Sequence, residues 1–139
     1  MKRVICALLA AALLAMCAPA LAEAKLTEAI MIYEDYDGNR AEQTVNDEET
    51  LKELGDMLLR ASKHKAELEN CTMNSSLFCM AEGGKIYDFA IATDGCPYIT
   101  DMETDQTYRL EDADHARLWE IFDLVQETMG YDASVVLGW

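Results

Sequence analysis

CTMNSSLFCMAEGGKIYDFAIATDGC, the stretch Cys71–Cys96, decides the fold of this 139-residue chain. At its centre lies Gly83-Gly84, a pair that tolerates positive φ at both positions, as a two-residue β-hairpin loop requires. If these glycines form the loop, Glu82 faces Lys85, and counting outward places Cys71 opposite Cys96. The turn is placed without reference to the cysteines. The sequence therefore predicts a β-hairpin closed by a cross-strand disulfide between Cys71 and Cys96.

Alternation along this hairpin assigns its two faces, because alternate residues of a strand point the same way. The aromatic face is expected to meet helices and comprises Phe78, Met80, Tyr87, Phe89 and Ile91. The milder face comprises Leu77, Cys79, Ile86, Asp88, Ala90 and Ala92. A moderately apolar surface left open can bind a partner. We therefore expect Leu77, Asp88 and Ala90 to form a ligand face.

Residues 1–22 have the pattern of a secretory signal peptide. Lys2 and Arg3 precede an apolar run, Val4–Met16, and the letters ALA at 20–22 supply a small-x-small cleavage site. We expect cleavage after Ala22, with Ala24 as the alternative. Residues 23–139 are then expected to form a single domain, because their number suits one modest core.

The predicted location of the mature protein is outside the cell. Secretion is the first expectation, since the better small-residue site lies downstream of Cys17. The alternative is a lipid anchor at the cell surface through Cys17, although Met16 is larger than the residue that usually precedes a lipidated cysteine. No stop-transfer segment follows the signal, so the sequence predicts no stable membrane insertion of the mature chain.

Three cysteines remain in the mature chain: Cys71, Cys79 and Cys96. An odd count in an exported protein leaves one thiol over, and an oxidising compartment allows a disulfide to persist. A Cys71–Cys96 bridge closes about 26 residues and stabilises the fold by roughly 3 kcal/mol in the chain-entropy model. Cys79 would face Asp88 in this register and is expected to be a small buried hydrophobic residue.

The chain is strongly acidic, with a net charge of −15 that removal of the signal lowers to −17. Nucleic acid and anionic membrane surfaces are expected to repel it. Asp101, Glu103 and Asp105 follow a short predicted strand and are weak candidates for a Ca²⁺ site. A solvated acidic rim is the plainer interpretation. The sequence implies no cofactor.

Two helices are predicted around the hairpin. The first begins at an Asn46 cap with Glu49 three residues later, and its apolar stripe comprises Leu51, Leu54, Leu58 and Ala61. The second runs from about Asp112 to Met129, with Gly130 as its stop and His115 in its exposed first turn.

Short strands at 26–34, 98–100 and 106–110 complete the predicted fold, and 41–45 is a candidate for one more. The terminal stretch 131–139 is apolar and is expected either to add an edge strand or to remain free. The fold class is α+β: an antiparallel sheet of about five strands, with two helices mainly on one face and one cross-strand disulfide.

The run Val45–Val125 contains a D/N-capped helix, a Cys-led strand, a glycine turn and a strand ending in Ala92-Thr93-Asp94-Gly95-Cys96. In this pattern it resembles small uncharacterised exported domains of Gram-positive bacteria. The resemblance implies export and an α+β fold, and it brings no known activity. Cys79 is additional to the two-cysteine pattern of these domains.

The sequence contains no G-x-S-x-G, H-E-x-x-H, P-loop or Rossmann glycine motif. The leading hypothesis is therefore an exported, non-catalytic binding or interaction module, whose partner is an unidentified protein or small ligand. One alternative is a weak Ca²⁺-binding protein. Another is a thiol-dependent enzyme that uses Cys79 with His115.

Overall fold

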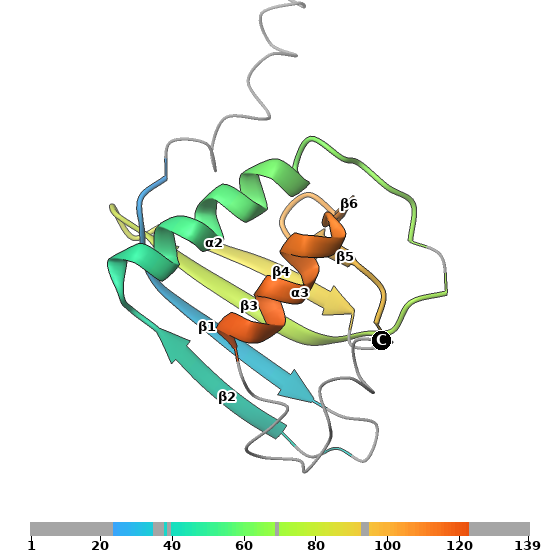
Figure 1. The fold of residues 1–139 in the computed structure, drawn as a ribbon, viewed down its shortest axis with the longest axis horizontal. Coiled ribbons are helices and arrows are strands. Elements are labelled where there is room, and N and C mark those ends of the chain that lie inside the picture. The colour runs from blue at the N-terminus through green and yellow to red at the C-terminus, as the bar shows by residue number, and fades with distance from the viewer. Residues whose placement is uncertain (1–23, 35–37, 39, 69, 93–94, 123–139) are drawn as a thin grey trace, which may run out of the picture.

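A computed structural model describes residues 24–34, 38, 40–68, 70–92 and 95–122 (Figure 1). These residues form one six-stranded antiparallel sheet in the order β2-β1-β3-β4-β5-β6, with helices α2 and α3. The predicted α+β class is confirmed. The predicted signal peptide and the stretch 131–139 lie outside the described residues. The elements are β1 Leu26–Glu34, β2 Arg40–Val45, α2 Glu48–Ala61, β3 Met73–Ala81, β4 Ile86–Ala92, β5 Tyr98–Asp101, β6 Gln106–Arg109 and α3 Asp112–Ile121.

Both helices pack on the same face of the sheet, the one toward the viewer in Figure 1. The apolar strand residues of this core are Leu26, Ala29, Met31, Tyr33, Ala41, Val45, Leu77, Cys79, Ala81, Phe89, Ile91 and Ile99. Except at Leu26, where the register shifts before Glu28, these positions alternate along each strand, as burial on one side of a pleated sheet requires. We call this side the covered face and the opposite side the open face.

Helix α2 begins one residue later than predicted, with Asp47 as its N-cap. The Asp47 backbone is extended, and its carboxylate accepts a hydrogen bond of 2.9 Å from the Thr50 amide. Asn46 is therefore not the cap, and the predicted capping box with Glu49 does not form. The apolar stripe packs as expected: Leu51, Leu54, Met57, Leu58 and Ala61 are buried.

The β3–β4 hairpin has a register one residue away from the predicted one. Met80 pairs with Ile86, and the Ala81 amide donates to the Lys85 carbonyl at 2.9 Å, so the loop spans three residues, 82–84. Gly83 and Gly84 do adopt positive φ, at 86° and 84°. A one-residue slip turns a whole strand over. The predicted faces of β4 are therefore correct and those of β3 are wrong.

The slip places Leu77 and Cys79 on the covered face and Phe78 and Met80 on the open face. Leu77 is fully buried in the core, so it does not share a face with Asp88 and Ala90 as predicted. Cys79 pairs with Tyr87 across the hairpin, and Phe78 takes the predicted place of Cys79 opposite Asp88.

Helix α3 ends at Ile121, and the Phe122 backbone is no longer helical. The rest of the predicted continuation to Met129, from residue 123 on, lies outside the described residues. Two bidentate ion pairs hold α3 to α2: Arg117 with Glu53 at 2.8 and 3.0 Å, and Arg60 with Asp114 at 2.7 and 2.9 Å. The Arg117 guanidinium lowers the pKa of the Glu53 carboxyl. Neither described helix is long and apolar enough to cross a membrane.

Candidate functional site

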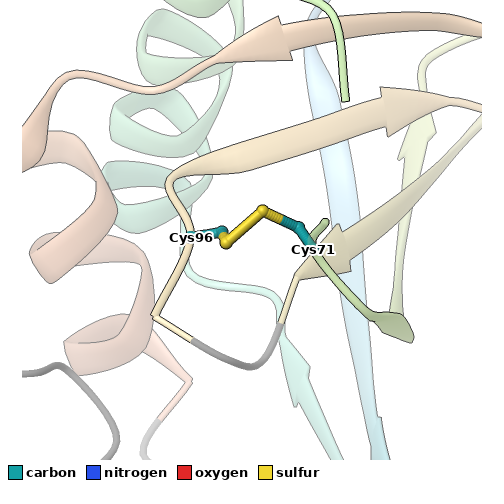
Figure 2. The surroundings of a disulfide bond; sticks show 2 residues. All are labelled: Cys71 and Cys96. Atoms are coloured by element: carbon teal, nitrogen blue, oxygen red, sulfur yellow. A yellow bond between two sulfur atoms is a disulfide. The ribbon is translucent and has the colours of Figure 1, made fainter. Parts of the chain in front are cut away.

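The Cys71–Cys96 disulfide is present, with the two Cα atoms 6.2 Å apart (Figure 2). Both cysteines lie beyond the ends of β3 and β4, outside the paired residues of the ladder. The predicted pairing is thus confirmed, while the register used to derive it is wrong. The bridge joins the segment that enters β3 to the segment that enters β5. It fixes the end of the hairpin opposite its glycine loop.

Cys79 is the free cysteine of the described residues, and it is fully buried on the covered face. Burial raises the pKa of its thiol to about 12. A cysteine nucleophile needs an accessible thiolate. The position of Cys79 provides neither access nor a thiolate.

Two of the three acidic candidates for a Ca²⁺ site, Asp101 and Glu103, have other partners. The Asp101 carboxylate accepts hydrogen bonds from the Glu103 and Thr104 amides, at 2.9 and 3.3 Å, and so closes the β5–β6 turn. Glu103 instead pairs with Lys85 at 3.4 Å. Among the residues that the structure describes, no three His, Cys, Asp or Glu side chains are grouped to hold a metal ion.

His115 is buried, only 8% exposed, rather than lying in an exposed turn as predicted. Its Nε2 accepts a hydrogen bond of 3.2 Å from the Trp119 indole, and the Trp119 ring meets Tyr33 of β1 edge-on. Burial lowers the pKa of His115. The spacing of four residues between His115 and Trp119 puts both on one helix face and was the available signal for this contact.

The open face carries an apolar area over β1, β3 and β4, within which the register also places Ser76 and Asp88. Directly paired residues point to the same side of a sheet, so Ile30 lies beside Phe78, and Met80 lies beside Ile86. Ile86 is 57% exposed. The apolar residues of this area are Ile30, Ile32, Phe78, Met80, Ile86 and Ala90.

Neither described helix covers this area, since α2 and α3 both pack on the covered face. Ile30, Ile32, Phe78, Met80 and Ala90 are each only half-buried. Partly exposed apolar side chains gathered on adjacent strands form the kind of surface that partners bind. Sequence reasoning missed Phe78 and Met80 because the slipped register assigned the odd positions of β3 to this face. It missed Ile30 and Ile32 because the face was predicted from the two strands of the hairpin alone.

Asp88 lies between Ile86 and Ala90 on the open face of β4, directly opposite Phe78. Burial, with a smaller contribution from the nearby Asp101 charge, raises the pKa of the Asp88 carboxyl. The surroundings of Asp88 therefore disfavour its ionised carboxylate. A cation brought to Asp88 would relieve this cost.

A groove of about 240 Å³ lies elsewhere, between the start of β1 and α2. Leu26, Leu51 and Gly55 contribute to its apolar lining. The two lysines on its rim, Lys25 and Lys52, are already paired with carboxylates at 3.2 and 2.7 Å. They are therefore not free to orient a ligand, and the open face is the stronger candidate site.

No family model, no curated protein and no solved structure matches this chain.

Proposed function

We propose that this protein is an exported, non-catalytic binding module that binds its partner through the open face. One observation carries the proposal. Six apolar residues lie together on three adjacent strands, on the side of the sheet that neither described helix covers. Exposed apolar patches with polar residues around them are typical of interaction sites.

Two features support a binding role over catalysis. The sequence lacks the common catalytic motifs, and the buried Cys79 thiol, with its pKa raised to about 12, is a poor nucleophile. The disulfide fixes the segment that enters β3 to the segment that enters β5, which restricts the sheet and lowers the entropic cost of binding. Export follows from the signal-peptide pattern of residues 1–22, with lipidation at Cys17 as the alternative.

The test is selection of a displayed peptide library on the secreted domain, followed by affinity measurement on two variants. Ile30→Thr/Phe78→Thr removes apolar surface from the open face while keeping β-forming residues. Leu68→Thr is the matched control, because Leu68 is 46% exposed and lies in the loop after α2. Selected peptides should lose about tenfold in affinity on the double variant and keep their affinity on the control.

Ile86→Thr guards against a folding defect in the double variant, since a side chain that is 57% exposed contributes little to the core. It should weaken the same peptides by a smaller factor. Selected peptides that bind all three variants equally well would overturn the proposal, as would the absence of any enriched peptide.

A further inference from the structure

The shape and charge of the open face specify what kind of partner it binds. Its apolar area covers three adjacent strands, which lie ~4.8 Å apart, so it is about 10 Å wide. Along β1 it extends from the level of Glu28 to that of Ile32, about 13 Å at ~3.3 Å per residue. An α-helix is ~10 Å in diameter and rises 5.4 Å per turn. The area therefore accommodates one helix of two to three turns lying along the strands.

Two carboxylates lie on opposite sides of Ile30, Ile32 and Phe78. Glu42 on β2 lies directly opposite Ile32, and Asp88 on β4 lies directly opposite Phe78. Glu28 lies opposite Met80 at one end of the area. A helix lying over Ile30, Ile32 and Phe78 would thus have a carboxylate along each flank.

Cations on this face are few and are already near acids. Arg40 at the end of β2 is 4.0 Å from Glu42 and pairs in register with Glu34. Arg109 on the far strand β6 donates to Asp112 at 3.2 Å. Over β1–β4 the face is therefore net negative, and the whole chain carries −15. A second copy would place like charges against one another, which costs free energy.

We propose that the open face binds an amphipathic helix of a partner protein, with an apolar stripe bordered on both sides by Lys or Arg. This inference rests on the proposed function, since it names the occupant of the same face. The partner's apolar stripe would cover the six apolar residues, and its cations would reach Glu42 and Asp88. A cation at Asp88 also offsets the repulsion between Asp88 and Asp101.

Two synthetic helical peptides of about 18 residues test the charge requirement, since isolated helices much shorter than this are unstable. Both carry the same Leu/Ala stripe; one has Lys on its flanks and the other has Glu. The Lys peptide should bind the secreted domain at least about tenfold more tightly than the Glu peptide, and added salt should weaken it. Equal affinity for both peptides would overturn the inference.

Substitutions in the protein test which of its carboxylates bind the Lys peptide. Glu42→Gln/Asp88→Asn should weaken the Lys peptide about tenfold, and Ile30→Thr/Phe78→Thr should weaken it at least as much. Glu48→Gln/Glu49→Gln removes two charges from the first turn of α2, on the covered face, and should leave the affinity unchanged. Equal losses on both charge variants would mean binding by net charge alone and would overturn the inference.

The experiment separates this inference from the proposed function. If library peptides need Ile30 and Phe78 but lack flanking cations, the basic-helix inference fails and the binding face stands. Sedimentation that gives a dimer, lost in Ile30→Thr/Phe78→Thr, would make a second copy the occupant. A chain without residues 131–139 that binds the Lys peptide about tenfold more tightly would make that stretch the occupant. Either result overturns the partner-helix inference.

Discussion

The two faces of the sheet are built from alternate residues of the same strands, yet only one of them is closed. On β1, Met31 is fully buried beneath the helices, while its neighbour Ile30 is half-exposed on the other side. On β3, Leu77 and Phe78 differ in the same way. Both faces are apolar, so hydrophobicity alone does not decide which becomes core. Helix packing on one side decides it, and the apolar residues of the other side remain available to a partner.

The largest expected difference in stability is between truncation of Leu77 on the covered face and truncation of Phe78 on the open face. Leu77→Ala should lower the free energy of unfolding by about 3 kcal/mol, because it leaves a cavity in the core. Phe78→Ala should lower it by less than half as much, since that side chain is already partly in water. Urea titration of both variants measures the difference. Equal losses would show that the open face is also covered in solution.

The same pair of residues shows where sequence reasoning succeeded. Alternation on β4 correctly sent Tyr87, Phe89 and Ile91 toward the helices, because their side chains alone gave the pattern. On β3 both parities are apolar, so only the register could choose between Leu77 and Phe78. That choice depended on whether the loop holds two residues or three, and Gly83-Gly84 suits both loop lengths.

The Cys71–Cys96 bridge and the burial of His115 show two further limits of sequence reasoning. The bridge was predicted by counting outward from Gly83-Gly84, and the pairing is correct although that register is wrong by one residue, because both cysteines lie beyond the paired residues of the ladder. His115 was assigned to solvent because a histidine in the first turn of an acidic helix usually lies there. Its burial depends on tertiary contact with Trp119 and on the position of α3 over the sheet, which local sequence does not encode.

Removing the disulfide should destabilise both faces of the sheet equally. The disulfide fixes one end of the β3–β4 hairpin, and this hairpin contributes residues to both faces. Cys71→Ala/Cys96→Ala should cost about 3 kcal/mol, since it frees a loop whose ends are 25 residues apart. Chemical denaturation measures the loss, and hydrogen exchange compares the faces. The ranking of Leu77→Ala above Phe78→Ala should persist in this background. A reversed ranking would mean that the bridge, rather than helix packing, distinguishes the faces.

Low pH should lower the free energy of unfolding through His115, which is buried on the covered face. The pKa of His115 is lowered in the fold from 6.5, so below pH 6.5 the unfolded chain binds a proton that the folded chain resists. The contribution of neutral His115 to the free energy of unfolding is fully present above pH 6.5. It is lost as the pH drops, by at most about 2 kcal/mol at pH 5. Urea titrations at pH 7 and pH 5 should show this loss in the wild type and not in His115→Gln. His64→Gln, at an exposed histidine, should keep it, and a flat wild-type profile would contradict the prediction.

Asp88 on the open face should change the stability with pH in the opposite direction to His115. This is the smallest effect expected. Its carboxyl pKa is raised in the fold, so the folded chain binds a proton more readily than the unfolded one, and stability falls as the pH rises through this range. Asp88→Asn should therefore raise Tm slightly at pH 7 and have less effect at pH 4. Glu67→Gln removes the same charge from an exposed loop and should leave Tm unchanged. A lower Tm for Asp88→Asn would show that the ionised carboxylate already has a stabilising partner. A bound cation would then bring no gain at Asp88.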